Sequence, residues 1–380
     1  MFIGTSEDKM AVTERQCEWE NMEAGGVLKN YRDVYRMLED EESRKVYLNY
    51  LNWVISGDLK YIDALEPIIA AEVFPILREQ TMNLRNSIPK DHKIIFYGAG
   101  EVGKKVLPFW KEDKRFIGFC SRTKEKQERG YCNYPVISPE ELFLRKDLSV
   151  VISVDLEKPK SEIKQLLYEN QYPSELIFEA PTVYSCASQA QYFSPGFIVY
   201  GKNEVFLDVG CLDLGSSLEF KKHCKSIKKI YAFEPDPQNY QICLLKKQEY
   251  SFSEVELLPY GTWSERATLH FNATHDCNSR ISEDGCVHVQ VMPIDEVIDP
   301  ADKVTMVKMD IEGAELESLK GAKTIIQRDR PKLAICIYHK PKDIIEIPMY
   351  IKKIVLEYKL YMRHYSSGPC ETVLYAMMPK

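Results

Sequence analysis

The sequence contains two places where a short apolar run leads directly into a glycine-containing turn. The first turn is GAGEVG at 98–103, after Lys93–Tyr97, and the second is GCLDLGSS at 210–217, after Glu204–Val209. Further apolar runs alternate with helical stretches after each turn. This order of strands and helices produces parallel sheets with right-handed crossovers. The chain is therefore predicted to be an α/β protein with two Rossmann-like sheets.

Three segments are predicted from the spacing of the apolar residues. Residues 1–90 are expected to form a helical amino-terminal segment, because apolar residues recur every three or four positions over 31–77. Residues 91–185 are expected to form a smaller Rossmann-like domain, and residues 186–380 a larger α/β domain. The length of 380 residues agrees with two or three folding units of roughly 150 residues each.

Composition and charge argue against several classes of protein. Apolar residues make up 44% of the chain and charged residues 28%, as in a water-soluble globular protein. The net charge of −7 argues against a uniformly basic nucleic-acid-binding protein. No apolar run approaches the roughly 20 residues of a membrane span, and residues 1–10 lack the pattern of a secretory signal. The eleven cysteines form no C-x-x-C pair, which favours reduced thiols and a cytoplasmic location.

The first glycine turn has the context of a dinucleotide-binding loop. Gly98, Gly100 and Gly103 lie between a strand and a helix, where backbone amides and the helix dipole favour phosphate. The acidic residue that binds the ribose should follow about 20 residues later, but the next strand ends in Cys-Ser-Arg at 120–122. Either the glycines serve packing alone, or the turn binds a ligand such as a nucleotide or a nucleotide-sugar.

The second glycine turn suits a different ligand. Asp208 precedes Gly210, and the next glycine, Gly215, follows five residues later, which is not the spacing that binds a diphosphate. Such a turn fits S-adenosylmethionine (SAM), whose amino-acid end needs backbone amides for its carboxylate and a carboxylate for its ammonium group. The candidate contacts in this turn are Asp208, Gly210, Cys211, Asp213, Gly215 and Ser216.

The strand after this turn ends in an acidic residue. Glu234 and Pro235 follow the apolar run 229–233. A carboxylate at this position can accept hydrogen bonds from both hydroxyls of a ribose. Glu234 and Pro235 are therefore predicted to contact the cofactor.

Acidic residues and histidines mark the later strands. Asp310 follows a strand and is expected above the ligand crevice. Glu312 and Glu315 open a helix whose dipole also favours acids, so helix capping stays an alternative to chemistry for both. His339 ends the next strand and is a candidate base, and His364 is a second one. No metal site is assigned, although a divalent ion held by Asp310 with Glu312 is an open alternative to base assistance.

Residues 204–377 resemble the FkbM family of SAM-dependent methyltransferases. The segments that carry the resemblance are EVFLDVGCLDLGSS, IYAFEPDP, VKMDIEGAELESLKGA, KLAICIYHK and the closing RHYSS…ETVLYA. The resemblance implies the class I methyltransferase fold, in which a mostly parallel seven-stranded sheet carries one antiparallel strand. It also implies methyl transfer, usually to a hydroxyl group of a sugar or secondary metabolite.

The resemblance also implies a role for each part of the site. Asp208, Gly210 and residues 211–217 would hold the methionine part of SAM. Glu234 would hold the ribose, and Asp310 would lie near the transferred methyl group.

Other parts of the chain depart from the family core or extend it. Many family members have glycine where this chain has Leu214. Residues 91–173 are similar to nucleotide-binding-type domains that are joined to sugar-modifying enzymes. The helical residues 38–61 resemble the segment that precedes the FkbM core, so the smaller domain is expected to be an insertion.

The leading hypothesis is a SAM-dependent O-methyltransferase acting on a hydroxyl of a sugar, glycan or related secondary metabolite. In-line methyl transfer would be assisted by a base, either His339 or Asp310, which adds roughly 10²–10⁴-fold to the rate. Two alternatives stay open: an NAD(P)-dependent sugar oxidoreductase using Gly98 to Gly103, and a non-catalytic protein that binds SAM or a nucleotide. The expected partner is a small-molecule or glycan acceptor, with no nucleic acid and no membrane span. The oligomeric state is not predicted.

Overall fold

The computed structural model describes residues 24–155, 157–272, 280–281 and 287–379. The expectation about a secretory signal concerns residues 1–10, which lie outside these ranges. The chain divides into two compact units, one made of residues up to 68 together with residues from 191 onward, and one made of residues 69–190. The smaller unit is thus inserted into the sequence of the larger one.

The smaller unit begins earlier and ends later than the segment 91–185 expected from the sequence. The difference at its start comes from helix α5 (Glu66–Ser87). Arg85, near the end of α5, donates hydrogen bonds to the Asp113 carboxylate (3.1 Å) and to the Phe109 carbonyl oxygen (3.1 Å). Apolar spacing predicts that a helix forms, but it does not say which sheet the helix covers.

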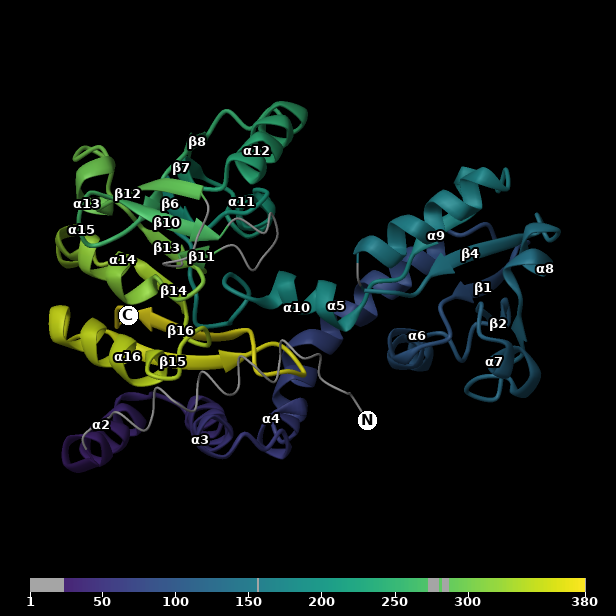
Figure 1. The fold of residues 1–380 in the computed structure, drawn as a ribbon, viewed down its shortest axis with the longest axis horizontal. Coiled ribbons are helices and arrows are strands. Elements are labelled where there is room, and N and C mark those ends of the chain that lie inside the picture. The colour runs from purple at the N-terminus through teal and green to yellow at the C-terminus, as the bar shows by residue number, and fades with distance from the viewer. Residues whose placement is uncertain (1–23, 156, 273–279, 282–286, 380) are drawn as a thin grey trace. The chain divides into compact units, whose positions relative to one another are not determined.

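Five parallel strands form the sheet in the described part of the smaller unit, in the order β3-β2-β1-β4-β5 (Figure 1). The strands are β1 (Lys93–Tyr97), β2 (Phe116–Cys120), β3 (Val136–Ile137), β4 (Leu148–Ile152) and β5 (Ile177–Glu179). The other helices are α6 (Glu101–Val106), α7 (Lys124–Arg129), α8 (Pro139–Phe143), α9 (Glu157–Glu169) and α10 (Val183–Ala190), with 3₁₀ turns at Leu107–Phe109 and Ser174–Leu176. Ile95, Val150 and Leu167 belong to the core between the sheet and α9.

Seven strands form the sheet of the larger unit where it is described, in the order β15-β16-β14-β13-β6-β7-β8. They are β6 (Glu204–Val209), β7 (Ile227–Phe233), β8 (Val255–Leu258), β13 (Met306–Met309), β14 (Lys332–Cys336), β15 (Lys359–His364) and β16 (Thr372–Met377). Strand β16 is antiparallel to both of its neighbours, and the other pairs are parallel. This mostly parallel α/β sheet confirms the expected fold class.

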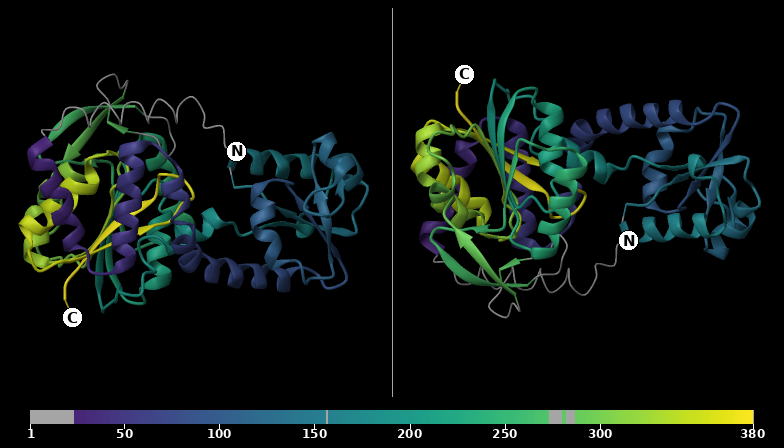
Figure 2. Two further views of the ribbon diagram at one scale, coloured as in Figure 1. Left: turned by 90° about the horizontal axis from the view of Figure 1, so that it is seen from below. Right: turned by 90° about the horizontal axis from the view of Figure 1, so that it is seen from above.

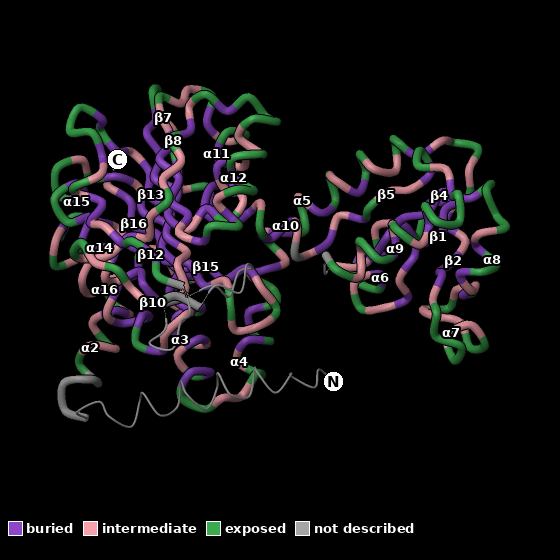
Figure 3. The backbone as a smooth tube through the Cα atoms, turned by 45° about the horizontal axis from the view of Figure 1, so that its top comes forward, coloured by how far each residue is buried: buried purple, intermediate pink, exposed green. Residues whose placement is uncertain are grey.

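Helices of the larger unit cover both faces of its sheet, with α11 and α12 on one side and α14, α15 and α16 on the other (Figures 1 and 3). Their bounds are α11 (Gly215–His223), α12 (Pro237–Glu249), α13 (Ile294–Val297), α14 (Glu315–Gly321), α15 (Lys323–Asp329) and α16 (Asp343–Ile354). Across the described ranges, no helix is both long enough and apolar enough to cross a membrane.

The leading helices α2 (Ala24–Met37), α3 (Glu41–Ser56) and α4 (Lys60–Asp63) also belong to the larger unit. Helix α3 packs against β15 (Figures 1 and 2). The Ser43 hydroxyl accepts a hydrogen bond from the Met362 amide (2.9 Å), and the Asp40 carboxylate pairs with Arg363 (2.8 Å). The amino-terminal helices thus complete the edge of the sheet that the end of the chain forms.

A second sheet of short strands is found in the described parts of 261–292, in the order β11-β10-β12-β9. The strands are β9 (Gly261–Thr262), β10 (Ala267–Asn272), β11 (Arg280–Ile281) and β12 (Val287–Met292). Residues 287–292, in which apolar and polar residues alternate, therefore form a strand outside the main sheet.

The central strands of the main sheet are buried on both faces (Figure 3). All residues of β6 and β13 are buried. Strands of this kind read as nearly continuous apolar runs instead of an alternation, which explains why they stood out in the sequence. Asp208 and Lys308 are charged residues inside these buried strands, and both belong to the candidate site.

Candidate functional site

A pocket opens at the edge of the larger sheet where β6, β7 and β13 end. Strand β6 is paired in parallel with both other strands, so the residues that follow each strand meet at the same edge. The lining comprises Val209, Gly210, Leu212, Phe233, Glu234, Pro235, Asn239, Tyr260, Gly261, Thr262, Val289, Val291, Asp310, Ile311, Glu312 and Ala314.

The turn after β6 has a constrained backbone. Gly210 has a φ of 78°, and a Cβ atom at this position would collide with the carbonyl oxygen of Asp310. Leu214, the position at which the sequence departs from the FkbM pattern, has a φ of 63° and is fully buried. Burial of a leucine side chain contributes about 1.5–3 kcal/mol, which offsets a left-handed backbone cost of roughly 1–2 kcal/mol. The turn can therefore adopt this backbone conformation without a glycine at position 214.

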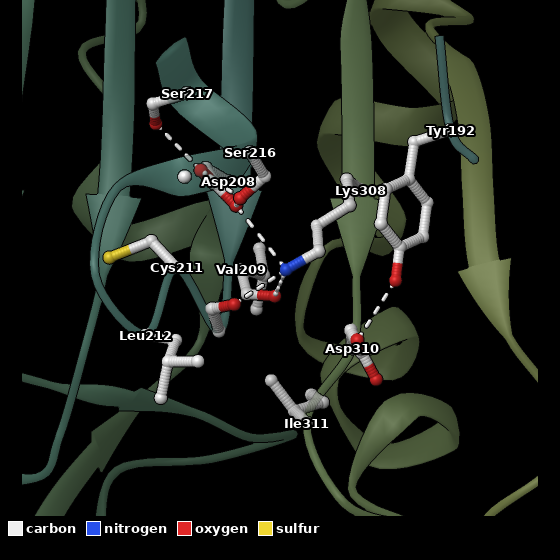
Figure 4. A network of polar contacts seen from close by, with 12 residues as sticks. Tyr192, Asp208, Val209, Cys211, Leu212, Ser216, Ser217, Lys308, Asp310 and Ile311 are labelled. Atoms are coloured by element: carbon white, nitrogen blue, oxygen red, sulfur yellow. Dashed lines mark hydrogen bonds and ion pairs between the residues drawn. The ribbon is translucent and has the colours of Figure 1, made fainter. Parts of the chain in front are cut away.

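Asp208 lies in β6, two residues before Gly210, and is not part of the pocket lining. Figure 4 shows its carboxylate between Ser216, Ser217 and Lys308. Its buried carboxylate accepts hydrogen bonds from the hydroxyls of Ser216 (2.7 Å) and Ser217 (2.6 Å). It also lies 3.4 Å from the Nζ atom of Lys308. In this structure Asp208 ties the start of α11 to the sheet, and its contact with the methionine end of SAM stays a prediction.

Lys308 is a residue of this region that the sequence analysis missed. Its Nζ atom, which Figure 4 shows between Asp208 and Val209, donates a hydrogen bond to the Gly210 carbonyl oxygen (2.5 Å). Burial alone would lower the pKa of Lys308, but the carboxylates of Asp208 and Asp310 outweigh this effect and raise it. A charged residue inside a buried strand requires a buried partner. The lysine within the apolar segment VKM at 307–309 was therefore the sequence signal that could have predicted the pair of Lys308 and Asp208.

The other turn residues predicted to contact the cofactor face neighbouring parts of the protein. The buried Cys211 thiol lies 3.8 Å from the Cys243 thiol. Asp213 accepts a hydrogen bond from the Gly215 amide (2.9 Å) and forms an ion pair with Lys246. Of the predicted turn residues, the structure places Gly210 in the lining and Asp208, Cys211, Asp213, Gly215 and Ser216 outside it.

Glu234 is fixed at the pocket edge beside Pro235. Its carboxylate accepts hydrogen bonds from the backbone amides of Leu212 (2.9 Å) and Asp236 (2.9 Å). Burial of the side chain raises the pKa of Glu234 to about 7. Because two amides already orient this carboxylate, it can bind a ligand without a further ordering cost.

Asp310 lines the pocket next to the glycine turn. Its carboxylate accepts hydrogen bonds from the hydroxyls of Tyr192 (2.8 Å) and Tyr338 (3.2 Å), the first of which Figure 4 shows. Burial would raise the pKa of Asp310, but the charges of Lys308 and His339 outweigh it and lower the pKa. The sequence analysis missed Tyr192, because a contact over more than one hundred residues leaves no local pattern.

His339 is surrounded by carboxylates and does not itself line the pocket. Its Nε2 atom lies 3.4 Å from Asp310 Oδ1 and 3.5 Å from Glu312 Oε1. Its Nδ1 atom lies 2.8 Å from Glu315 Oε1, which also accepts a hydrogen bond from the Ile311 amide. Burial would lower the pKa of His339, but the charges of Glu315 and Glu312 outweigh it and raise the pKa well above its usual value. The structure therefore brings the two candidate bases, Asp310 and His339, together.

The second candidate histidine lies elsewhere in the larger unit. His364 is fully buried at the end of β15, with Nδ1 2.8 Å from the Thr372 hydroxyl. Burial lowers the pKa of His364 to about 4, and it is not in the pocket lining.

The loop between β15 and β16 contains Glu371, an acidic residue that the sequence analysis did not name as a candidate. Burial and the charge of Asp310 raise the pKa of Glu371 to about 7.

Packing explains two of the three glycines in the first turn, in the smaller unit. A Cβ atom on Gly98 would lie 2.7 Å from the Ser153 carbonyl oxygen, and one on Gly103 would lie 2.6 Å from the Gly98 carbonyl oxygen. No atom of the described chain lies within 4 Å of the same position on Gly100. The packing interpretation thus accounts for Gly98 and Gly103, whereas Gly100 faces open space.

Comparison with known proteins gives a family match and several similar proteins. Residues 208–361 match the methyltransferase FkbM domain. The hexuronic acid methyltransferase AglP of Haloferax volcanii is 29% identical over 113 residues, which cover 27% of this chain and 45% of the relative. The chain thus matches less than half the length of that relative.

Two solved structures are also similar. One is the methyltransferase FkbM from Methylobacillus flagellatus, with 19% identity and a TM-score of 0.44, covering 83% of this chain and 100% of that chain. The other is a SAM-dependent methyltransferase from Aquifex aeolicus, with 14% identity and a TM-score of 0.28, covering 47% of this chain and 84% of that chain.

Proposed function

We propose that this protein O-methylates a hydroxyl group of a sugar, glycan or related small molecule, because residues 208–361 match the methyltransferase FkbM domain. The domain supports methyl transfer as the activity and SAM as the methyl donor. The hexuronic acid methyltransferase among its relatives supports a sugar acceptor. The observation that carries the proposal is the pocket of this domain, whose lining contains both the Glu234 and the Asp310 carboxylates.

The pocket has features that suit the nucleoside part of SAM. The Glu234 carboxylate, already held by two backbone amides, can accept hydrogen bonds from both ribose hydroxyls. Gly210 lets a ligand approach the backbone closely, and the apolar side chains of Phe233 and Val291 offer a surface for the adenine ring. When bound, SAM supplies the methyl carbon, and its carbon–sulfur bond breaks with the electron pair left on sulfur.

Asp310 is the residue best placed to meet the acceptor hydroxyl. Tyr192 and Tyr338 orient its carboxylate, which lines the pocket. The acceptor oxygen gains the methyl group and loses its proton, which the Asp310 carboxylate is placed to accept. Asp310 is favoured over His339 for this contact because His339 lies behind it.

The first experiment is a calorimetric titration of the whole chain with SAM and, separately, with NAD(H) and NADP(H). We expect SAM alone to bind. Glu234→Gln should weaken SAM binding tenfold or more, about 1.4 kcal/mol or more, because the amide is an uncharged acceptor. Glu256→Gln is the matched control. The Glu256 carboxylate on β8 forms an ion pair with Lys229 on β7, and neither residue lines the pocket. Nicotinamide binding without SAM binding would contradict the proposal and favour an oxidoreductase that uses the Gly98 turn.

The second experiment measures transfer of labelled methyl from SAM to glycosides of hexuronic acids and of neutral hexoses. Asp310→Asn is expected to lower the turnover at least a hundredfold while SAM still binds. A protein that binds SAM but methylates none of these acceptors would instead support the non-catalytic alternative. The methylated position in any product would be read by NMR, and a label on nitrogen or carbon would exclude O-methylation.

A further inference from the structure

Three side chains of the kinds that bind metals meet beside the pocket: Asp310, Glu312 and His339. One ligand atom from each lies within 4.8 Å of the other two. Asp310 follows β13 and His339 follows β14, which are neighbouring parallel strands, so both residues reach the same sheet edge. Glu312 joins them through a left-handed backbone with a φ of 54°. Such a conformation is uncommon for a residue other than glycine and clusters at functional sites.

His339 has the surroundings of a metal ligand. Its side chain is 6% exposed, and among the residues described neither of its ring nitrogens has a hydrogen-bond partner. The distances from Nε2 to Asp310 (3.4 Å) and Glu312 (3.5 Å) are longer than ordinary hydrogen bonds. The other nitrogen, Nδ1, lies 2.8 Å from Glu315 Oε1. Metal-binding histidines commonly turn their second nitrogen to a carboxylate in this way, which aims the first nitrogen at the metal.

The Glu315 carboxylate, which contacts Nδ1 of His339, is itself held by the backbone. Glu315 is fully buried, and its Oε1 atom accepts a hydrogen bond from the Ile311 amide (2.9 Å). The carboxylates of Asp310, Glu312 and Glu315 therefore converge on one imidazole. Several carboxylates in one partly buried place are costly unless positive charge compensates them.

We propose that Asp310, Glu312 and His339 together bind one divalent metal ion of the Mn²⁺ or Mg²⁺ type. Two carboxylates and one imidazole make a three-ligand face that leaves the remaining positions open to other oxygen ligands. In a six-coordinate ion with bonds of about 2.1 Å, adjacent ligand atoms lie roughly 3 Å apart. The separations of 3.4 Å and 3.5 Å found here are close to that value. The imidazole favours Mn²⁺ over Mg²⁺.

The open positions of such an ion face the pocket. With the ion bound, Asp310 is a metal ligand, and the ion lowers the pKa of the acceptor hydroxyl in place of proton transfer to the free Asp310 carboxylate. The side chains of Asp310 and Glu312 are 25% and 27% exposed and line the pocket, whereas His339 lies behind them. This consequence rests on the proposed function and names the acceptor class: a sugar acid or a vicinal diol, whose neighbouring oxygen atoms can chelate one cation. An acceptor carboxylate would otherwise meet two negative side chains without a positive charge between them.

Direct metal binding tests the proposal. The whole chain, freed of metal with a chelator and dialysed, is titrated with MnCl₂ while free Mn²⁺ is followed by electron paramagnetic resonance. We expect one Mn²⁺ per chain and a tenfold or greater loss of affinity in Glu312→Gln. Glu317→Gln is the matched control, because that carboxylate pairs with Lys320 outside the cluster, and it should bind like the unmodified chain. No stoichiometric binding, or equal affinity in Glu312→Gln and the control, would overturn the proposal.

A second variant guards against loss of binding through misfolding. Glu315→Gln keeps all three ligands but removes the carboxylate that orients His339, and an affinity loss of about 10–100-fold is expected. Circular dichroism melting of each variant shows whether the fold survives. Unchanged Mn²⁺ affinity in a folded Glu315→Gln variant would contradict the role given to His339.

The metal site and the proposed function can fail separately. Methyl transfer to a sugar acid that continues at full rate after chelation would overturn the metal proposal and keep the methyltransferase. Mn²⁺ binding that Glu312→Gln weakens, without SAM binding or methyl transfer, would keep the metal site and contradict the methyltransferase.

Discussion

The two glycine turns of this protein are built alike but stand in different chemical surroundings. In each turn, a side chain from the neighbouring strand holds the carbonyl oxygen of the first glycine. In the larger unit the donor is the Lys308 ammonium (2.5 Å to Gly210), and in the smaller unit it is the Ser153 hydroxyl (2.9 Å to Gly98). The strand ends beside Gly210 carry acids that line a pocket, whereas β2, one of the two strands beside β1, ends in Cys-Ser-Arg at 120–122.

This difference separates evidence for a fold from evidence for a function. A glycine turn between a strand and a helix is required by tight packing in both units, as the positions of Gly98 and Gly210 show. The chemistry comes from what the adjacent strands place at the same edge, here Glu234 and Asp310. A glycine motif alone therefore indicates a Rossmann-like sheet, and its ligand must be argued from the neighbouring strand ends.

The largest expected effect is a loss of folding stability when the side chains that bind the two glycine carbonyl oxygens, Lys308 and Ser153, are replaced. Lys308→Met leaves the Asp208 carboxylate buried without its cation and should lower the free energy of unfolding by about 3–5 kcal/mol. Ser153→Ala removes a neutral hydroxyl that the Gly98 (2.9 Å) and Tyr97 (3.3 Å) carbonyl oxygens share, and it should cost about 1 kcal/mol. Urea unfolding, followed by probes in each unit, measures both losses. Equal losses would show that the buried charge does not distinguish the turns.

An intermediate effect, on SAM affinity, is expected when a glycine of each turn is replaced by alanine. Gly210→Ala forces Cβ into the Asp310 carbonyl oxygen and should weaken SAM binding roughly a hundredfold, about 2.7 kcal/mol. Gly103→Ala disturbs only the smaller unit, so its SAM affinity should match that of the unmodified chain. Calorimetric titration of both folded variants is the measurement. A comparable loss of affinity in Gly103→Ala would mean that the first turn also serves the cofactor.

The smallest effect is a pH dependence that belongs to the larger unit alone. Burial raises the pKa of Glu234 to about 7, and the ionised carboxylate is the form that accepts both ribose hydroxyls. SAM affinity should therefore fall as the pH drops below about 7, by at most tenfold per pH unit. Titrations between pH 8 and pH 6 test this, with Glu234→Gln as the variant whose affinity should respond less. A flat profile in the unmodified chain would remove Glu234 as the titrating group.

Sequence patterns predicted the sheets well because buried parallel strands have a distinctive composition. The runs at Lys93–Tyr97 and Glu204–Val209 became β1 and β6 at the same residues. The boundary of the smaller unit differed, because the apolar spacing of α5 does not identify the sheet that it covers. Strand β12 (Val287–Met292) joins a different sheet from β6 and β13, because local sequence does not specify which strand is its partner.

The site was predicted less completely, for reasons of geometry. Glu234 and Asp310 lie in the pocket lining. Each directly follows a parallel strand, so its position at the carboxyl edge of the sheet could be predicted. Asp208 lies inside its strand, and only the structure shows that Ser216 and Lys308 occupy its carboxylate. Tyr192 reaches Asp310 across 118 positions, a separation that no periodic pattern encodes.

The pairing of Asp40 with Arg363 has a consequence for synthesis on the ribosome. These partners are 323 positions apart, so at 5–20 residues per second the leading helices wait about 15–65 s for β15. Tyr47, Tyr50 and Trp53, which are buried in the finished protein, have no strand to cover them during that interval. Residues 69–190 are continuous in sequence and can fold meanwhile. The larger unit is thus completed only after the smaller one.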